Sequence, residues 1–214
     1  MANSSVNHSH RPDWYRRLFA WGIAHGMARY QRTVARYKKT LFADIRGDVV
    51  EIGPGAGANF AYLPSSIRWI GVEPNPFMHP YLRRQAEQLG VEIDIRTSTV
   101  EQMDVDDNSV DIVISTLVLC SVPDVAVALR DIHRVLRPGG RFLFMEHVAA
   151  PRGTLLRSAQ QAIRPLWQWV GDGCCPDREL WVELEQAGFA RVEYQRFEVP
   201  FPIIKPHIMG VATK

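Results

Sequence analysis

Short apolar runs rich in β-branched residues recur along the middle of the chain, with stretches of helical periodicity between them. Their length, four to six residues, is typical of strands that are buried on both faces of a sheet. Their alternation with helical segments predicts βαβ units and a mainly parallel sheet. The predicted strands are Val49–Ile52, Trp69–Val72, Val91–Ile95, Val110–Ser115 and Phe142–Met145.

The last part of the chain has two further strand-like runs, Arg191–Phe197 and Ile208–Thr213. The proline-rich segment Val199–Pro206 between them has no room for a crossover helix, which parallel neighbours require, so we expect this pair to be antiparallel. The predicted fold class is therefore α/β, a Rossmann-like sheet with helices on both faces and an antiparallel last strand. Aromatic residues are dense in this part of the chain, where a lid over an apolar acceptor would lie: Trp167, Trp169, Trp181 and Phe201. Helical spacings favour core packing instead for most of the set Leu166, Trp167, Val170, Trp181 and Leu184.

Apolar residues near the N-terminus follow steps of four and three, which is the spacing of one helical stripe. They are Ile23, Met27, Tyr30, Val34, Tyr37 and Leu41, and an earlier piece consists of Trp14, Leu18 and Trp21. Gly22 and Gly26 are the expected breaks between two helices. We therefore predict a disordered leader (residues 1–11), a basic N-terminal helical segment packed on the domain (12–46), and the main domain (47–214).

The net charge of +2 is unevenly distributed along the chain. Residues 1–46 contain nine Lys or Arg and two Asp, which gives +7 and leaves −5 for the remainder. A basic helix on an acidic body is most simply a solvated helix face, with contact to an anionic membrane surface or to nucleic acid as the alternatives. The sequence does not decide whether this helix also closes over the site as a lid.

The compartment is predicted from what the sequence lacks. No run of about 18 uninterrupted apolar residues is present, and the first residues contain no apolar core of a secretory signal. The cysteines Cys120, Cys174 and Cys175 are few and odd in number, which indicates a reducing compartment. Because they do not have the paired spacing of a zinc site, we expect no metal. These features predict a cytoplasmic protein.

The first predicted strand leads directly into the glycine-rich segment Glu51-Ile-Gly53-Pro-Gly55-Ala-Gly57. Closely spaced glycines let the backbone turn sharply and bring its N–H groups against a ligand. Glu73 ends the second predicted strand, twenty positions after Gly53, where a carboxylate can accept hydrogen bonds from both hydroxyls of a ribose. Together these features predict a nucleoside cofactor.

Four separate motifs then recur in order: Val49–Gly57, Ile70–Glu73, Asn108–Ile114 and Val135–Arg141. In these motifs the sequence, over residues 48–213, resembles the class I S-adenosylmethionine-dependent methyltransferases. The resemblance implies a methyltransferase with S-adenosylmethionine as its cofactor, and a seven-stranded sheet with a reversed last strand.

The resemblance also implies roles for single residues. It assigns Glu51, Gly53, Gly55 and Gly57 to the methionine part of the cofactor, Glu73 and Asn75 to the ribose, Thr99, Val100 and Glu101 to the adenine, and Thr116 and Leu117 to the border of the transferable methyl group. The family often has Asp-Ala-Glu around the adenine, whereas this chain has Thr99-Val100-Glu101.

Several stretches are similar to one branch of the family, the thiol S-methyltransferases. They are Gly57–Phe60, Glu73–Pro76, Thr116–Val122, Phe144–Ala150, Gly171–Cys174 and Pro206–Gly210. They favour a small, lipophilic acceptor, with a thiol preferred and a quinone, phenol or lipid amine as alternatives. Relatives in that branch have a hydrophobic N-terminal membrane anchor. Here Arg16, Arg17 and His25 interrupt the apolar residues, so we expect at most peripheral membrane contact through the basic helix.

Methyl transfer to a thiol needs alignment and a base, because a thiol with a pKa of about 8.5 is mostly protonated near neutral pH. His147 is the first candidate, since it follows the fifth predicted strand and carboxyl ends of strands form the ligand crevice of such sheets. Asp172, between Gly171 and Gly173, is the second candidate. The structural alternatives are a histidine bonded to backbone and an aspartate in a turn or N-cap, and we expect His207 to be structural.

Two other classes of function are compatible with parts of the sequence. A nicotinamide-binding oxidoreductase would suit Gly53-x-Gly55-x-x-Ala58, but no Tyr-x-x-x-Lys or comparable hydride-transfer motif is present. A non-catalytic membrane-surface module would use the basic helix. The Asn-Pro-Pro-Tyr type motif of base amino methylation is absent, so we expect no nucleic-acid partner. No pattern specifies an oligomeric state.

Overall fold

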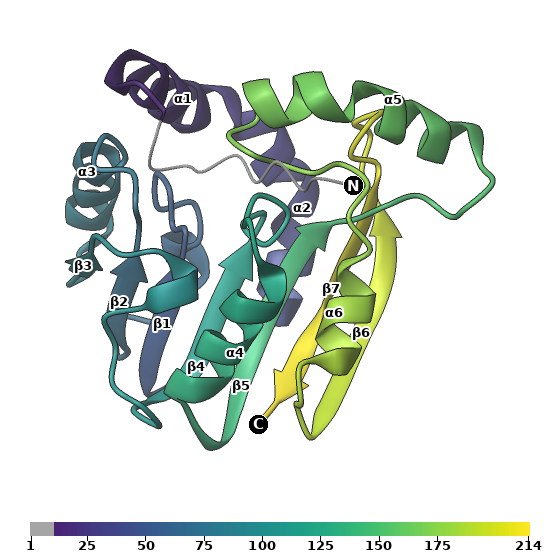
Figure 1. Cartoon of the computed structure of the whole chain (residues 1–214). Coiled ribbons are helices and arrows are strands. Elements are labelled where there is room, and N and C mark those ends of the chain that lie inside the picture. The colour runs from purple at the N-terminus through teal and green to yellow at the C-terminus, as the bar shows by residue number, and fades with distance from the viewer. Residues whose placement is uncertain (1–10) are drawn as a thin grey trace.

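The computed structural model describes residues 11–214, and these residues form one seven-stranded sheet in the order β3-β2-β1-β4-β5-β7-β6 (Figure 1). The strands are β1 (Asp48–Ile52), β2 (Arg68–Val72), β3 (Asp94–Arg96), β4 (Val110–Thr116), β5 (Leu136–His147), β6 (Arg191–Glu198) and β7 (Pro206–Thr213). Strands β1 to β5 pair in parallel, and β7 runs antiparallel to both β5 and β6. The predicted α/β fold with its reversed last strand is confirmed.

The third strand is shorter and begins later than the predicted Val91–Ile95. Gly90 ends the preceding helix with a φ of 66°, and the Val91 N–H then donates to the Ala86 carbonyl at 2.9 Å. Val91 therefore closes the helix instead of starting the strand.

Helices cover both faces of the sheet and its upper edge in Figure 1. They are α1 (Asp13–Gly26), α2 (Ala28–Leu41), α3 (His79–Leu89), α4 (Val125–Val135), α5 (Leu155–Val170) and α6 (Leu180–Gln186), with the 3₁₀ turns η2 (Phe60–Tyr62) and η3 (Val100–Gln102). Successive strand residues point to opposite faces, so Val50 packs in a cluster with α4 and α6, whereas Val49 packs in a cluster with α3. This arrangement makes three layers with the sheet in the middle.

The N-terminal segment forms two helices that meet at Met27. The predicted stripe is buried on α2, where Tyr30 and Val34 pack against Met145 and other residues of the sheet. The earlier piece of the stripe on α1 does not continue this packing, because Trp14, Leu18 and Trp21 are more than half exposed. The break at Met27 turns the two helices relative to each other, so α1 buries Tyr15 and Ala20 instead. The leader predicted for residues 1–11 lies outside the described residues, except for Arg11.

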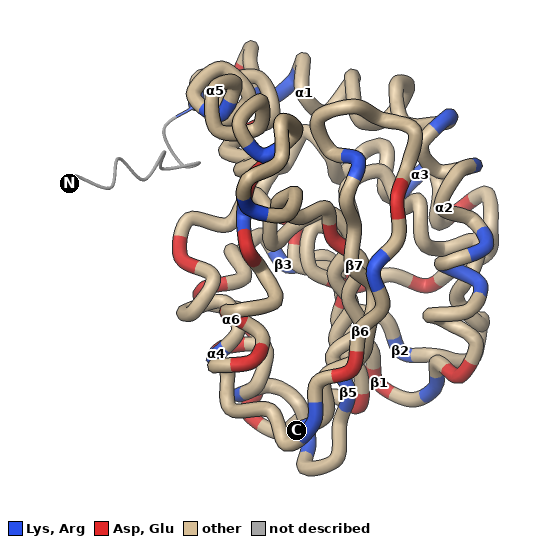
Figure 2. The backbone as a smooth tube through the Cα atoms, turned by 90° about the vertical axis from the view of Figure 1, so that its right-hand side faces the viewer, with Lys and Arg blue, Asp and Glu red and all other residues tan. Residues whose placement is uncertain are grey.

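The prediction that the apolar residues of α5 pack in the core is wrong for part of this helix. Leu166 and Val170 are 61% and 57% exposed, whereas Leu184 of α6 is fully buried as expected and Trp181 packs against the same core. Helix α5 contributes only Gln160 to the buried set, because it lies with α1 across the carboxyl ends of the strands rather than on a face of the sheet. Figure 2 shows α1 and α5 together at this end from a second direction.

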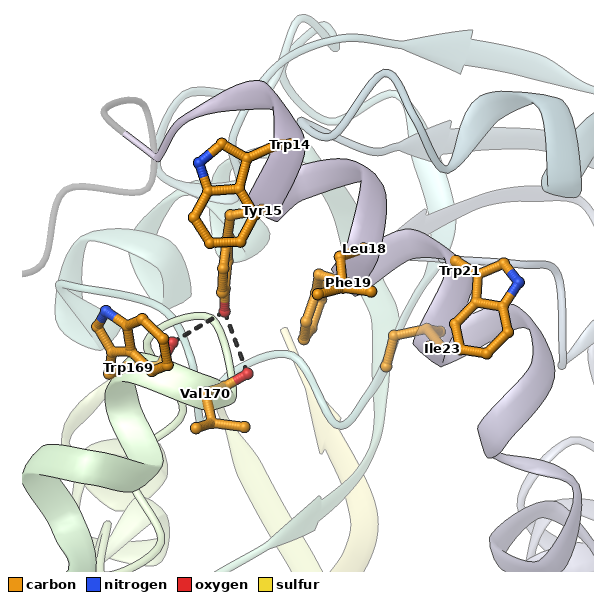
Figure 3. A pocket seen from close by; sticks show the side chains of 9 residues that line it. Trp14, Tyr15, Leu18, Phe19, Trp21, Ile23, Trp169 and Val170 are labelled. Carbon is orange, nitrogen blue, oxygen red and sulfur yellow. Dashed lines mark hydrogen bonds between the residues drawn. The ribbon is translucent and has the colours of Figure 1, made fainter.

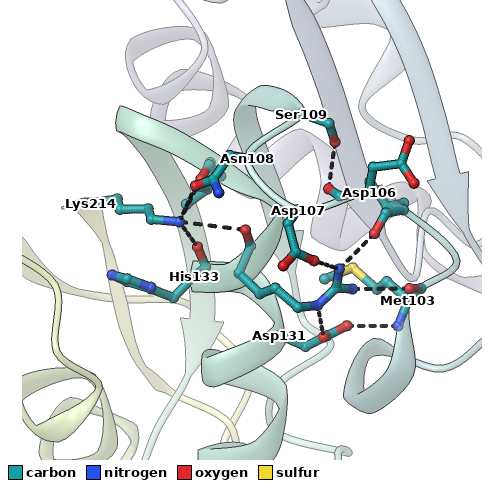
Figure 4. A network of polar contacts seen from close by, with 11 residues as sticks. Met103, Asp106, Asp107, Asn108, Ser109, Asp131, His133 and Lys214 are labelled. Carbon is teal, nitrogen blue, oxygen red and sulfur yellow. Dashed lines mark hydrogen bonds and ion pairs between the residues drawn. The ribbon is translucent and has the colours of Figure 1, made fainter.

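The opposite end of the sheet is held by two cationic side chains (Figure 4). The Lys214 Nζ atom donates to Asn108 Oδ1 and to the His133 and Leu136 carbonyls at 2.6 to 2.8 Å. Arg134 forms ion pairs with Asp131 and Asp107, both at 2.6 Å. These contacts join the β4 and β5 starts far from the strand ends that carry the glycine loop.

Within residues 11–214, no helix has the length and apolar character that crossing a membrane requires.

Candidate active site

A cavity of about 690 Å³ opens at the carboxyl ends of β1 to β4. Its sheet side consists of the loops that follow these strands, and the opposite wall comes from α1 and α2. This is the edge where ligands bind in open α/β sheets, and the volume suits a small-molecule site.

The glycine loop after β1 makes one wall of the cavity. Gly53, Gly55 and Gly57 all have positive φ, at 55°, 56° and 80°. A Cβ on Gly53 would lie 2.6 Å from Val118 Cγ2, and both residues line the cavity. Gly53 and Gly55 therefore bring the backbone to the cavity surface, whereas Gly57 packs against Phe60 and does not line the cavity.

Glu73 lies at the end of β2 with its carboxylate on the cavity. Its two oxygens accept hydrogen bonds from the N–H groups of Gly55 at 3.1 Å and Asn75 at 2.9 Å. Burial raises the pKa of Glu73 to about 7, although these N–H donors act to lower it and Asp172 adds a smaller increase. A carboxylate buried in this way gains from further donors, which the two hydroxyls of a ribose supply.

Asn75 and the segment after β3 complete this side of the cavity. Asn75 Oδ1 accepts the Phe77 N–H at 3.1 Å, which fixes the turn after Glu73. The predicted adenine residues Thr99, Val100 and Glu101 all line the cavity, at the start of η3.

Glu51 does not line the cavity, although the sequence predicts it as a cofactor contact. Its carboxylate accepts hydrogen bonds from Asn59 Nδ2 at 2.8 Å and from the Trp69 indole N–H at 3.0 Å. The same Asn59 amide donates to Thr116 Oγ1 at 3.0 Å. Glu51 thus positions Asn59 and Thr116, both of which line the cavity, from the layer below.

Leu117 is held in a left-handed conformation at the end of β4, with φ of 59°. Its N–H donates to the Met145 carbonyl of β5 at 3.0 Å, which stabilises the turn. Thr116 and Leu117, which the sequence predicts to border the transferred methyl group, both line the cavity. Strained backbone of this kind is concentrated at functional sites.

The two predicted bases lie in different surroundings. Asp172, with φ of 49°, lines the cavity in the loop after α5. His147 does not line the cavity, because it is buried at the end of β5 and its Nε2 lies 2.9 Å from Cys174 Sγ. Burial lowers the pKa of His147, but the Cys120 thiol and the Glu146 carboxylate outweigh this effect and raise it. His207 is buried against Tyr30, as a structural residue would be.

The sequence leaves open whether the N-terminal helices close over the site, and in the structure α1 and α2 form one wall of the cavity. Phe19, Ile23, Ala24, Met27 and Ala28 line the cavity with apolar surface opposite the glycine loop. Two residues of this wall, Ile23 and Met27, belong to the apolar stripe that the sequence predicts.

Gln31 of α2 also reaches the cavity and is supported by a buried lysine. Lys38 Nζ donates to Gln31 Oε1 at 2.6 Å, and only 1% of Lys38 is exposed. Burial lowers the pKa of Lys38 to about 8, although the negative charge of Glu51 acts to raise it. No local pattern distinguishes this lysine from the other basic residues of the helix.

The comparisons with known proteins agree with this geometry. Residues 50–144 match the family model described as a methyltransferase domain. The chain is 37% identical over 196 residues to the human thiol S-methyltransferase TMT1B, covering 86% of this chain and 80% of the relative. The chain belongs to the S-adenosylmethionine-dependent methyltransferases.

Further comparisons support this family and its fold. Human thiol S-methyltransferase TMT1A is 37% identical over 198 residues, covering 86% of this chain and 81% of TMT1A. The crystal structure of the YcgJ protein from Bacillus subtilis superposes with a TM-score of 0.69 at 19% identity, covering 86% of this methyltransferase and 98% of that chain, and it shows the shared fold. The cofactor is S-adenosylmethionine, and the cavity, the glycine backbone and the Glu73 carboxylate suit it.

Proposed function

We propose that this methyltransferase acts on the sulfur of a small, lipophilic thiol. The observation that carries the proposal is the apolar wall of α1 and α2, which faces the glycine loop across the cavity and includes Phe19, Ile23 and Met27. Such a wall favours apolar acceptors and excludes water from them. The relatives TMT1A and TMT1B are named as thiol S-methyltransferases, which supports sulfur as the accepting atom.

Different residues of the cavity hold the cofactor and border the atoms that react. When bound, S-adenosylmethionine supplies an electrophilic sulfonium methyl group. Glu73 and the backbone of Gly53 and Gly55 hold the nucleoside and methionine parts, while Thr116 and Leu117 border the reacting end. The main contribution of the cavity to the rate is alignment of the acceptor sulfur with the methyl group, since displacement at a methyl group depends on near-attack geometry.

Asp172 is the proposed acceptor of the thiol proton. It lines the cavity, whereas His147 is separated from it, and a base must come within hydrogen-bond reach of the proton that it takes. An Asp172→Asn variant should lose more activity below the pKa of the acceptor thiol than above it, where the thiolate is already formed. Equal loss at all pH values would assign Asp172 to positioning instead.

A matched acceptor series tests the accepting atom. Benzyl mercaptan, benzyl alcohol and benzylamine share one apolar group and differ only at the nucleophile, and phenol and hydroquinone represent the phenol and quinone alternatives. We expect methylation of the mercaptan well above the others, measured by mass spectrometry with the Glu73→Ala variant as the control. Faster methylation of an oxygen or nitrogen acceptor would contradict the thiol proposal.

We further propose that the α1 and α5 end of the molecule contacts an anionic membrane surface. Trp14, Leu18 and Trp21 of α1 and Trp169 and Val170 of α5 are each more than half exposed and surround an apolar pocket of about 370 Å³ (Figure 3). Exposed tryptophans beside cationic groups are typical of interfacial helices, and the exposed Arg17 lies on α1. A lipophilic acceptor dissolved in a bilayer would then be close to the cavity.

Liposome sedimentation tests this contact. We expect binding to vesicles that contain phosphatidylserine, weaker binding at higher salt, and loss of binding in the double variant Trp14→Ala, Trp21→Ala. Leu89→Ala removes an exposed apolar residue of α3 and should have no effect. Equal binding of the double variant and the unmodified protein would contradict the proposal.

A further inference from the structure

Two cysteines and a histidine that are far apart in the sequence meet behind the cavity wall. Cys120 follows β4, His147 ends β5, and Cys174 follows α5. Their ligand atoms all lie within 4.8 Å of one another. The Cys120 and Cys174 Sγ atoms are 3.8 Å apart, and His147 Nε2 is 2.9 Å from Cys174 Sγ.

We propose that Cys120, His147 and Cys174 form a binding site for a zinc ion. With Zn–S bonds of about 2.3 Å and tetrahedral angles, two ligand sulfurs are about 3.8 Å apart, which is the separation in the structure. A ligand nitrogen and sulfur would be about 3.6 Å apart in the same geometry, so the His147 ring has to move by less than about 1 Å from Cys174. Three protein ligands leave one position of the tetrahedron for a further ligand.

The chemistry of the set favours zinc over a hard cation. Thiolate and imidazole are ligands for zinc and related borderline metals, whereas magnesium and calcium prefer oxygen. Two thiolates and a neutral imidazole around Zn²⁺ sum to zero charge, which suits a buried site. Cys120 and His147 are each 3% exposed.

The surroundings of the cluster add two observations. The Trp167 indole N–H donates to Cys174 Sγ at 3.3 Å, so this sulfur already acts as an acceptor in the structure. His147 Nδ1 is buried and has no hydrogen-bond partner among residues 11–214. The ring directs Nε2 toward Cys174 Sγ, so Nε2 is the nitrogen that would bind the metal.

The neighbouring Cys175 provides an internal control. Its sulfur accepts hydrogen bonds from Gln168 Nε2 at 3.0 Å and Arg178 at 3.4 Å, and it is not part of the cluster. Cys175 is thus adjacent in sequence to a proposed ligand but has different partners.

A metal at this site would connect the loop after α5 to the ends of β4 and β5. That loop carries Asp172, and Ser121 follows Cys120, and both of these residues line the cavity. The metal would therefore fix part of the cavity wall from behind. The cysteine spacing alone predicts no metal, because the three ligands are separated by 27 positions each and only the fold brings them together.

Metal content and cobalt substitution test the proposal without any acceptor or methyl donor. The full chain is purified under reducing conditions without chelator, and its zinc is measured by mass spectrometry. The metal-free protein is then titrated with Co²⁺, whose thiolate charge-transfer and tetrahedral d–d absorption report the ligand set. We expect one zinc per chain, and a cobalt spectrum that is retained in Cys175→Ser and lost in Cys120→Ser and Cys174→Ser.

The unmodified protein is decisive even if a variant fails to fold. Absence of stoichiometric zinc, together with no thiolate–cobalt absorption after titration, would overturn the proposal. A cobalt spectrum lost equally in Cys175→Ser would also overturn it. Isolation of a Cys120–Cys174 disulfide, with no metal bound after its reduction, would assign the pair to redox chemistry instead. None of these results bears on the thiol acceptor, so the two proposals fail independently.

Discussion

The hydroxyl of Tyr15 accepts a hydrogen bond from the backbone N–H of Asp172 at 3.0 Å. The same hydroxyl lies within donating distance of the Trp169 and Val170 carbonyls, at 3.0 and 3.1 Å. Tyr15 belongs to α1 and the other residues belong to the end of α5 and the loop after it. One buried side chain therefore joins two walls of the cavity that are more than 150 residues apart in the sequence.

Removal of this hydroxyl should weaken the contact between α1 and the loop after α5 without changing the residues that line the cavity. In Tyr15→Phe the ring keeps its packing, while the Asp172 N–H and two carbonyls lose a partner, so we expect a loss of about 1 to 2 kcal/mol in unfolding free energy. KM for the acceptor should rise several-fold. Denaturant unfolding and steady-state kinetics measure both effects, with the exposed Trp14→Phe as the control, and an unchanged KM would show that the two walls are held by other contacts.

The glycine loop should tolerate no side chain at Gly53. An alanine there has a positive φ and places its Cβ 2.6 Å from a methyl group of Val118, a stiff β-branched residue of the cavity wall. Gly90→Ala is the matched control, since Gly90 has a φ of 66° and nothing within 4 Å of an added Cβ.

Both variants should lose about 1 kcal/mol of stability from the positive φ. Only Gly53→Ala should also lose cofactor binding, by at least tenfold in Kd for S-adenosylhomocysteine. Comparable affinities of the two variants would exclude the proposed close approach of the loop backbone to the cofactor.

Lys214 should contribute to stability and not to catalysis. Lys214→Met removes charge-assisted hydrogen bonds to Asn108 and to the His133 and Leu136 carbonyls, and we expect a loss of about 1.5 to 3 kcal/mol. Thermal unfolding measures it, with the exposed Lys39→Met as the control. Because the network lies at the amino ends of the strands, kcat of the folded enzyme should not change, and a lowered kcat would indicate coupling across the sheet.

The sheet and much of the cofactor side of the cavity could be predicted from the sequence because their signals are local. A buried strand of a parallel sheet is a continuous apolar run, and the loop after β1 needs glycine wherever φ is positive. Glu73 follows from the same logic, since the end of β2 is fixed by its own apolar run. The sequence predicts β3 less well, because Val91 belongs to the end of the preceding helix.

The remaining features depend on contacts between distant segments. The exposed face of α1 could not be distinguished from the buried face of α2 by periodicity, because both have the same spacing of apolar residues. Cys174 and His147 show no paired spacing, and only the meeting of β5 with the loop after α5 brings them together. Glu51 lies in a motif that predicts cofactor contact. In the structure, however, its side chain points toward Trp69, whose indole N–H donates to the carboxylate.

The most direct test of the cofactor site is the pH dependence of S-adenosylhomocysteine binding, measured by calorimetry. Burial raises the pKa of Glu73 to about 7 in the free protein, and ribose hydroxyls that donate to its carboxylate favour the ionised form. Binding therefore releases a proton at acidic pH, and Kd should be about tenfold larger at pH 6 than at pH 8. Glu73→Gln cannot ionise, so its binding should be weaker and independent of pH. Equal Kd values for the unmodified protein at the two pH values, matched by Glu73→Gln, would contradict the proposed role of Glu73 in holding the cofactor.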